Sequence, residues 1–237
     1  MSSVLESVEW GKPALSLLSQ CRELDPNLPA VMHIRHSERP QIRSREERVA
    51  KLTESGKKAA YEFGTLLPTN RSYRLYHTIS DRAIETAEAI HQGLLSIDTD
   101  VRIEGVFLRS HHDHEKFWHY LAKNKFISEK EAARSFFINW ISDHFPPWEI
   151  EPCRLFAQIA ASVMMKNLDK LDSNGFDIYV SHDLWVASFF FCWFGVIPSM
   201  EWIEYLDGFI MQLTDDRMKL FYKDGKKEAY YPYWWNF

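Results

Sequence analysis

The stretch Ala30–Pro40, AVMHIRHSERP, joins a short apolar run to a cluster of charged side chains. The run Val31–Ile34 predicts a buried strand, and it ends in Arg35, His36 and Arg39. In open α/β sheets, ligands bind in the crevice beyond the carboxyl ends of the strands. Because the planar fork of arginine matches phosphate oxygens, two arginines beside a histidine predict a phosphate site that contains a nucleophile. The simpler alternative is a strand end with solvated charges. The other motifs of the chain distinguish this alternative from a phosphate site.

Length and composition indicate an ordinary folded protein. The 237 residues are enough for one sizeable domain, with room for an insertion. The chain is 46% hydrophobic and 26% charged, which is typical of a globular protein rather than a disordered one. Its net charge of −5 argues against a generic nucleic-acid binder. Any anion site must therefore use locally clustered cations. One such cluster contains Arg35, Arg39, Arg43, Arg45 and Arg48.

Cysteine usage and hydropathy favour a cytoplasmic location. The three cysteines, Cys21, Cys153 and Cys192, are widely spaced and include no CxxC pair. They predict reduced thiols, with neither a disulfide framework nor a zinc site. The N-terminal stretch has no basic start followed by an apolar core, so no secretory signal is expected. The most apolar run, Leu184–Ile197, is shorter than the roughly 20 residues of a membrane span, and it predicts a buried helix instead.

The periodicity of apolar residues alternates between strand-like and helix-like segments. Strands are expected at 30–35, 73–78, 101–108, 176–180, 208–213 and 218–222, the last two forming a hairpin. Helices are expected at 14–21, 57–67, 83–95, 154–171 and 184–194. Thr53 and Ser80 are candidate N-caps for two of these helices. This alternation predicts an α/β fold, specifically a three-layer α/β/α sandwich with a mostly parallel, mixed central sheet.

Three of the expected strand–helix loops carry charged side chains, at His36, Arg82 and His182. In a parallel sheet these loops can meet at one edge, which is the argument for a site. Arg82 is expected in the first turn of its helix, where the helix dipole disfavours a cation. A bound anion would remove that conflict.

The segment from about 110 to 152 differs from the rest, because it is rich in histidine and aromatic residues. It predicts a helical cap or insertion within a single domain, residues 1–237. The run Ser110–Glu115, with His119 beyond it, contains side chains that could bind a metal. It has no HExxH-like spacing, so a solvated segment or a substrate-contacting cap is preferred and no metal site is predicted.

Four motifs resemble those of one protein family. Arg35–Pro40, RHSERP, is similar to the RHGxRxP signature of the histidine phosphatase superfamily, in its acid phosphatase-like branch. Ser80–Ala87, SDRAIETA, resembles the SxxRAxxTA element, one residue shorter before the arginine. Ser181–Asp183 resembles the second-histidine motif, and Leu52–Gly56 resembles the LTxxG helix start. The motifs occur in the family's order across residues 30–195. The resemblance implies the phosphoglycerate mutase-like fold.

The resemblance also implies a reaction, the hydrolysis of a small phosphorylated molecule without a cofactor or metal. His36 would attack phosphorus and become a phosphohistidine, while Arg35, Arg39, Arg82 and His182 would bind the phosphate. The guanidinium groups would favour the neutral imidazole that this attack needs. An acid must then protonate the leaving oxygen. Asp183, which follows the second histidine, is the first choice, as in the acid phosphatase-like branch. Glu104 is the alternative, because mutase-like members place a glutamate after the third strand.

One departure leaves other functions open. Ser37 stands where the family has glycine, and a position that needs positive φ would be strained by serine. A phosphate-binding module with impaired catalysis is therefore an alternative. A mutase-like phosphotransferase and a metallohydrolase centred on His111–His119 are two others. No membrane partner is expected, and the oligomeric state is not indicated.

Three further features receive simpler interpretations. His33 is expected to be a hydrogen-bonded core histidine rather than a ligand. Glu85 and Thr86 are expected to be plain helix residues. The aromatic tail Tyr230–Phe237 is expected to pack against the body as an anchor, since an exposed patch of such residues would mark an interface.

Overall fold

The computed structural model describes residues 3–41, 49–108, 120, 128–197, 202–214, 216–223 and 225–235. The helices are α1 (Val4–Ser7), α2 (Gly11–Gln20), a 3-10 turn (Cys21–Glu23), α3 (Glu54–Thr65), α4 (Asp81–Leu95), α6 (Glu129–Ile141), α7 (Cys153–Leu168) and α8 (Asp183–Phe194). The strands are β1 (Ala30–Arg35), β2 (Ser72–His77), β3 (Val101–Val106), β4 (Gly175–Ser181), β5 (Gly208–Leu213), β6 (Arg217–Tyr222) and β7 (Gly225–Tyr230).

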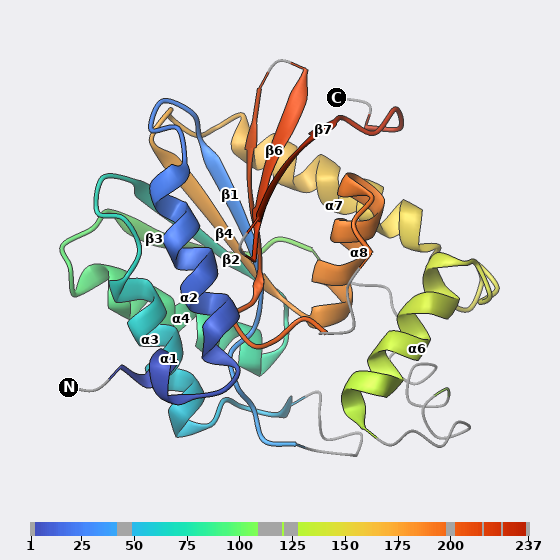
Figure 1. Cartoon of the computed structure of the whole chain (residues 1–237), viewed down its shortest axis with the longest axis horizontal. Helices are drawn as coiled ribbons and strands as arrows, with labels where there is room; N and C mark the ends of the chain where they lie inside the picture. The colour runs from blue at the N-terminus through green and yellow to red at the C-terminus, as the bar shows by residue number, and fades with distance from the viewer. Residues whose placement is uncertain are drawn as a thin grey trace.

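In the described part of the chain, seven strands form one sheet in the order β3-β2-β4-β1-β5-β6-β7. The first four strands of this order are mutually parallel, and β5, β6 and β7 continue the sheet with antiparallel pairings. Helices α1 to α4 cover one face and α6, α7 and α8 the other (Figure 1). The predicted three-layer α/β/α architecture with a mixed sheet is confirmed.

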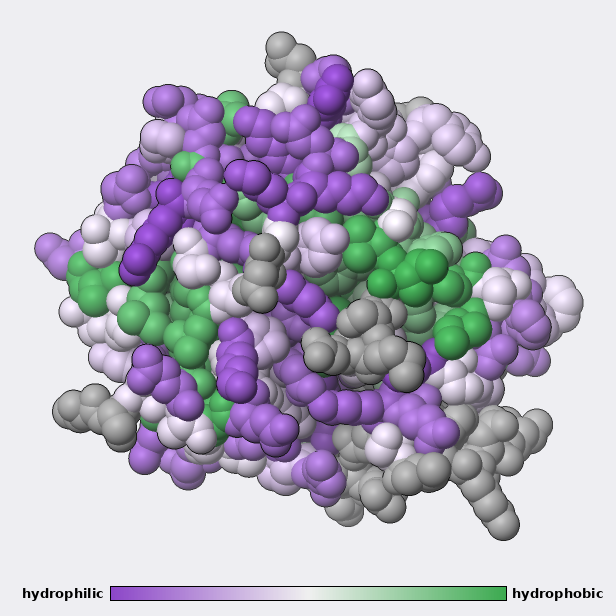
Figure 2. Space-filling view, in the orientation of Figure 1, coloured by the Kyte–Doolittle hydropathy of each residue, from purple (hydrophilic) through white to green (hydrophobic). Residues whose placement is uncertain are grey.

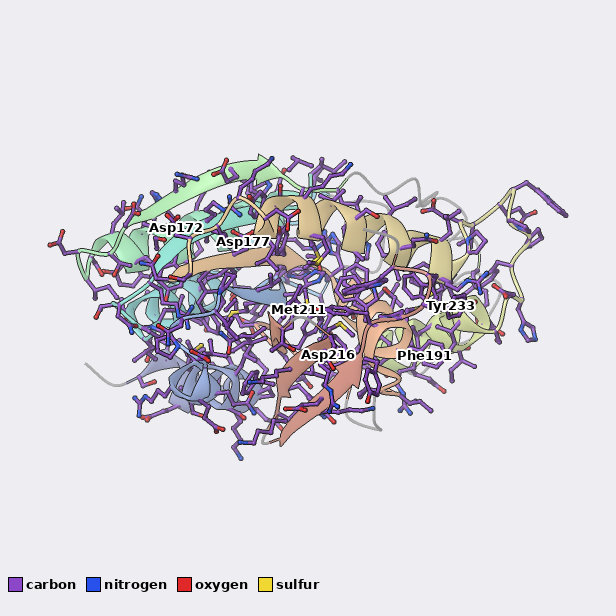
Figure 3. The ribbon with its side chains drawn as sticks, turned by 90° about the horizontal axis from the view of Figure 1, so that it is seen from above. Asp172, Asp177, Phe191, Met211, Asp216 and Tyr233 are labelled. Carbon is purple, nitrogen blue, oxygen red and sulfur yellow. The ribbon has the colours of Figure 1, made fainter. Side chains whose placement is uncertain are left out.

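Each face of the sheet has its own hydrophobic core, because side chains alternate along the strands. Met32 and Ile34 of β1 point into the core beneath α2, α3 and α4. Val31 contacts the opposite core, which is formed with α6, α7 and α8 and is rich in aromatic rings. Met211 of β5 lies in this second core, inside the molecule (Figure 3). The face of the molecule seen in Figure 2 is largely hydrophilic, with hydrophobic areas on its left side and to the right of its centre.

Most expected elements occur, but one strand was not expected. The sequence predicted a closing hairpin of two strands, whereas β7 adds a third strand beside β6. The first four residues of β7, Gly225–Glu228, are all exposed, so no alternation of apolar and polar residues marks the strand. Lysine-rich, charged sequences are typical of an edge strand, which must not pair with another chain.

The helix ends follow the sequence signals with one exception. The Thr53 side chain accepts from Gly56 N and caps α3 as predicted. Gly195, with φ of 61°, ends α8 in the left-handed conformation that glycine adopts at low cost. Ser80 occupies the N-cap position of α4, but its side chain makes no capping hydrogen bond there. Its hydroxyl is instead near the Thr78 hydroxyl, 3.2 Å away.

A buried ion pair lies within the sheet, away from the strand ends. Arg74 Nε and Nη2 donate to the two carboxylate oxygens of Asp177 at 2.7 and 2.9 Å. Tyr179 also donates to this carboxylate, and Arg74 Nη2 donates to the carbonyl of Asn167. Asp177 is fully buried and Asp172, in the turn before β4, is exposed; both are labelled in Figure 3. Since every described member of this group is paired with another, we assign it a structural role.

The aromatic tail packs against the body as expected, as far as residue 235. Trp235 is buried, and its ring lies 5.3 Å from that of Trp193. Gln158 Nε2 donates to the carbonyl of Trp234 at 3.1 Å. Tyr233 is exposed (Figure 3). All three cysteines are free.

Several predictions fall outside the described residues. They include those on Arg43, Arg45 and Arg48 and on most of the segment from 109 to 127, including Ser110–Glu115 and His119. Helix α6, within the expected insertion, packs against the core under α7 and α8 through Phe136, Phe137 and Trp140. Among the helices in the described ranges, none has the length and apolar character needed to cross a membrane.

Candidate active site

Three loops at the carboxyl ends of β1, β2 and β4 bring together His36, Arg82 and His182. Arg82, in the first turn of α4, donates from Nε to His36 Nε2 at 3.0 Å. Its Nη2 lies 3.4 Å from His182 Nδ1. The two imidazole rings are 5.5 Å apart and nearly perpendicular. The expected convergence of these loops at one sheet edge therefore occurs.

The contacts of His36 define which ring nitrogen can act as a nucleophile. Its Nδ1 lies 2.7 Å from the Ser37 carbonyl oxygen, which can only accept, so Nδ1 carries the proton. Nε2 then holds a lone pair, consistent with accepting from the Arg82 guanidinium. Burial, followed by the charges of Arg82 and Arg35, holds the pKa of His36 well below its usual value of 6.5. The imidazole is thus neutral at physiological pH, as predicted.

His182 is positioned by the same guanidinium and by a hydroxyl from the end of β2. Because Arg82 can only donate, His182 Nδ1 is the accepting nitrogen, and Nε2 carries the proton. This Nε2 lies 3.2 Å from Thr78 Oγ1, which accepts it. The ring also contacts that of Trp185, at 5.8 Å between centroids. His182 is thus held beside His36 with an N–H group at its far side.

Arg35 and Asp183 meet at the edge of this group. Arg35 Nη2 lies 3.7 Å from Asp183 Oδ2, and Nη1 donates to the Ile203 carbonyl at 2.7 Å. Asp183 is the first residue of α8, and its Oδ1 accepts from Leu184 N at 2.9 Å. Its carboxylate therefore lies next to a buried cation and directly after the second histidine of the site.

The other two predicted side chains are not joined to His36 by any described contact. Arg39 is buried, and its Nη1 donates to the Pro40 carbonyl at 2.8 Å, so its phosphate-binding role stays a prediction. Glu104 lies on the exposed surface of β3 and pairs with Arg102 at 2.5 Å. Its charge acts on Asp177 and Tyr76, and it is not among the charges that act on His36. Of the two candidate acids, the structure brings only Asp183 to the site.

Ser37 does not have the positive φ that would strain a serine. The described non-glycine residues with positive φ are Asp98, Asp143, Leu206 and Lys223, so Ser37 has an ordinary backbone conformation. Its hydroxyl donates to the Gly56 carbonyl at 2.7 Å. A Cβ on Gly56 would lie 2.3 Å from the Glu38 carbonyl oxygen. Glycine at position 56 therefore allows α3 to approach the loop that carries His36.

The interpretation of Glu85 and Thr86 as plain helix residues was wrong. Thr86 Oγ1 accepts from the backbone N of Ser37 at 3.0 Å and donates to the Arg82 carbonyl. Glu85 Oε2 accepts from the backbone N of Leu52 at 2.7 Å. Both side chains hold the loop around His36 to α4. Neither contact could be expected from helical spacing, because each partner is more than 30 positions away.

Comparison with solved structures identifies the architecture. A phosphoglycerate mutase from Bacillus anthracis has a TM-score of 0.51 to this chain at 17% identity, over 88% of this chain and 95% of that one. The chain has the phosphoglycerate mutase-like fold. A mycobacterial glucosyl-3-phosphoglycerate phosphatase, described in complex with VO3, is similar at a TM-score of 0.50 and 13% identity, covering 85% and 96% of the two chains. A protein named mycobacterial hydrolase 1 also has a TM-score of 0.50, at 12% identity, covering 85% and 97%. No protein-family model matches the chain, and no curated protein matches it.

In this phosphoglycerate mutase-like fold, the site also includes a fourth segment, which was not predicted from the sequence. It is Trp202–Asp207, which precedes β5. Trp202 Nε1 donates to Asp183 Oδ2 at 2.8 Å. The Tyr205 ring lies 4.4 Å from the Arg35 guanidinium and 5.8 Å from the His36 ring. Because β5 runs antiparallel to β1, its start lies where β1 ends. The sequence did not indicate that β5 pairs antiparallel with β1. Knowledge of that pairing would have located this segment at the site.

Two further expectations concern His33 and metals. His33 is fully buried among aromatic rings, and its Nε2 lies 2.6 Å from Ser181 Oγ, so it is the hydrogen-bonded core histidine that was predicted. Within the ranges that the structure describes, no three His, Cys, Asp or Glu side chains are grouped so as to hold a metal ion. The histidine-rich run Ser110–Glu115 is not among those residues.

Proposed function

We propose that the protein is a phosphomonoesterase of the histidine phosphatase superfamily, with His36 as the nucleophile. Its substrate is a small phosphorylated molecule, the reaction needs no metal, and the protein is cytoplasmic. The observation that carries the proposal is the state of His36. Its imidazole is neutral, with the Nε2 lone pair directed at the Arg82 guanidinium and His182 beside it. A buried nucleophilic nitrogen among donors suits attack on a phosphoryl group.

In the first step of the proposed reaction, His36 Nε2 forms a bond to phosphorus while the bond to the leaving oxygen breaks. Arg35 and Arg82 donate to the phosphoryl oxygens, where charge is concentrated in the transition state, and His182 joins them when its Nδ1, which faces Arg82, carries a proton. Asp183, in its protonated form, gives its proton to the leaving oxygen. Arg82 Nε donates to the lone pair of His36 Nε2. Phosphate binding must therefore draw this donor onto a phosphoryl oxygen before the attack can occur.

In the second step, water attacks the phosphohistidine and the N–P bond breaks. Asp183 accepts the proton of the water and returns to its protonated form, while His36 regains its neutral state and inorganic phosphate leaves. Asp183 is preferred to Glu104 for both proton transfers, because only Asp183 is in contact with the cluster, through Arg35. The ordinary backbone of Ser37 removes the argument for an impaired binding module.

Turnover of an aryl phosphate, with and without a chelator, tests the proposal. The wild type should release inorganic phosphate in both conditions, and His36→Ala should lose this activity. His144→Ala is the matched control, since His144 is exposed and lies in the turn after α6. Full activity in His36→Ala would overturn the mechanism, and loss of activity with the chelator would favour a metallohydrolase. Transfer of phosphate to an added alcohol in preference to water would favour a phosphotransferase.

A further inference from the structure

The carboxylate of Asp183 is held by an indole from outside the recognised motifs. Trp202 Nε1 donates to Asp183 Oδ2 at 2.8 Å, and Trp202 is 3% exposed. The other oxygen, Oδ1, accepts from Leu184 N in the same helix turn. Arg35 approaches Oδ2 only to 3.7 Å, which is beyond hydrogen-bond distance. The indole N–H is therefore the short contact that fixes the direction of Oδ2.

The indole itself is supported by α6. The Phe137 ring packs edge-on against that of Trp202, at 5.8 Å between centroids, and Phe137 is buried. Lys130, the second residue of α6, forms an ion pair with Glu204, which lies two residues after Trp202. Contacts from this helix thus reach the segment that carries the indole. They connect α6 to the carboxylate through Trp202.

The backbone after Trp202 adds a second link to the same site. The Ile203 carbonyl accepts from Arg35 Nη1 at 2.7 Å. Leu206 has a φ of 56°, a conformation that is unfavourable for a branched side chain, and its N donates to the Arg35 carbonyl. Strain of this kind persists where surrounding contacts over-determine the backbone, and it is often found at functional sites. The turn thus holds Arg35 and Asp183 together.

We propose that Trp202 is a positioning residue for Asp183, and that α6 supports it from behind. This inference rests on the proposed function, in which Asp183 transfers the protons. A carboxyl that must protonate a leaving oxygen has to point at it, and small errors in such geometry lower the rate strongly. Asp183 is partly exposed, with 20% of its side chain accessible, so it could turn toward solvent without the indole.

The test compares Trp202→Phe with Trp193→Phe. Trp193 is the matched control, because it is also 3% exposed and its Nε1 donates to the Ala157 carbonyl at 3.0 Å, away from the site. Trp202→Phe should lower kcat about tenfold for an alkyl phosphate, which needs a proton on its leaving oxygen. It should have a much smaller effect for an aryl phosphate with a good leaving group, with KM little changed. Trp193→Phe should not lower kcat for the alkyl phosphate more than kcat for the aryl phosphate.

A cycle with Asp183→Asn identifies the route of the effect. In the Asp183→Asn background, Trp202→Phe should cause no further loss for the alkyl phosphate. Phe137→Leu, which keeps the indole N–H but loosens its support, should give a smaller loss with the same dependence on leaving group. Losses that add in the cycle, or equal effects of Trp202→Phe and Trp193→Phe, would overturn the inference. Failure of the proposed function is distinguishable, because the wild type itself would then hydrolyse neither substrate.

A second, independent observation concerns two thiols. Cys153, the first residue of α7, and Cys192, in α8, have sulfur atoms 3.8 Å apart. The contact between the two thiols and the nearby charge of Arg154 lower the pKa of Cys192, whereas the same contact raises the pKa of Cys153. Cys192 is partly exposed, whereas Cys153 is buried. The pair thus joins an accessible thiol to a resolving partner on the neighbouring helix.

We infer that Cys153 and Cys192 are a site of reversible oxidation by hydroperoxides. The Cys192 thiolate attacks a peroxide oxygen, the O–O bond breaks, and the sulfur becomes a sulfenic acid with release of water or alcohol. The Cys153 thiol then attacks that sulfur, the S–S bond forms, and water leaves. Two thiols and one hydroperoxide thus give one disulfide between α7 and α8.

Mass spectrometry after hydrogen peroxide treatment tests this inference. The intact chain should lose the mass of two hydrogen atoms, and a peptide linking residues 153 and 192 should appear and disappear on reduction. Cys21, which is buried, should remain a free thiol and serves as the internal control. Cys192→Ser should abolish the cross-link. Accumulation of only sulfinic acid at Cys192, or disulfides only between chains, would overturn it.

Discussion

Ser37 shows how one side chain can replace the usual residue of a loop without strain. The motif that this loop resembles has glycine at this position, and serine would be costly there only at positive φ. Here the backbone is ordinary, and the buried hydroxyl donates to the Gly56 carbonyl. The serine therefore connects the loop of His36 to the start of α3. We expect it to stabilise the loop rather than to impair it.

Replacing Ser37 with glycine tests this role. Ser37→Gly removes a buried hydrogen bond and adds backbone freedom, so the free energy of unfolding should fall by about 1–2 kcal/mol. Chemical denaturation measures the change. Turnover of an aryl phosphate should not increase. A variant that is more active than the wild type would show that serine does restrain the site.

His33 predicts how stability depends on pH. Burial lowers the pKa of His33 from 6.5 to about 3. Between these values the unfolded chain binds a proton that the folded chain does not, so the free energy of unfolding falls as the pH falls. The contribution is intact above pH 6.5, and about 2 kcal/mol is lost by pH 5. Chemical denaturation at pH 6.5 and at pH 5 should show that the free energy of unfolding depends less on pH in His33→Gln than in the wild type.

Two controls isolate this effect. Burial raises the pKa of Asp207 to about 6, and this acts with the opposite sign, because the folded chain then binds the extra proton. The difference between His33→Gln and the wild type therefore measures His33, whereas the slope of the wild type alone does not. His144→Gln, at an exposed histidine, should leave the slope unchanged. An unchanged slope in His33→Gln would contradict the assignment.

At the scale of elements, the site depends on the start of α4. Arg82 lies in its first turn, where the helix dipole disfavours a cation, and Ser80 gives no side-chain cap. The Arg82 guanidinium also lies between two histidines. A bound phosphate dianion would satisfy the helix end and the guanidinium together. Anion binding should therefore stabilise this arrangement.

Inorganic phosphate or orthovanadate should therefore raise the Tm of the wild type. At a ligand concentration about 100 times Kd, the stabilisation should be about 2.7 kcal/mol. Arg82→Gln should lose most of this shift, because it removes the donors between the two histidines. Arg102→Gln, at an exposed arginine of β3, is the matched control and should keep it. Equal shifts in both variants would place the anion elsewhere.

At the same scale, the sequence predicted the parallel half of the sheet better than the rest. The apolar runs before His36 and His182 are buried on both faces, and such strands are recognisable from composition alone. The contacts of Thr86 with Ser37 and of Trp202 with Asp183 were not predictable in this way. They join residues that are adjacent only once the sheet order is known. Strand β7 was missed because its exposed side chains show no alternation.

For the whole molecule, the aromatic C-terminal segment closes the core that lies behind the site. The Trp235 ring packs on Trp193 of α8, the helix that begins with Asp183. Replacing Trp235 with alanine should lower the free energy of unfolding by about 3–5 kcal/mol, as measured by denaturant titration. Tyr233→Ala is the control, since Tyr233 is 84% exposed, and it should change little. Equal effects of the two variants would show that the tail does not pack as described.

The most direct test of the central claim is the detection of phosphate on His36. Rapid quenching of the wild type with a phosphorus-labelled aryl phosphate, followed by peptide mapping, should show an acid-labile, alkali-stable adduct on the peptide that contains His36. The adduct should be absent in His36→Ala and present in His144→Ala. Label on another residue, or turnover with no phosphoenzyme at any quench time, would contradict the account.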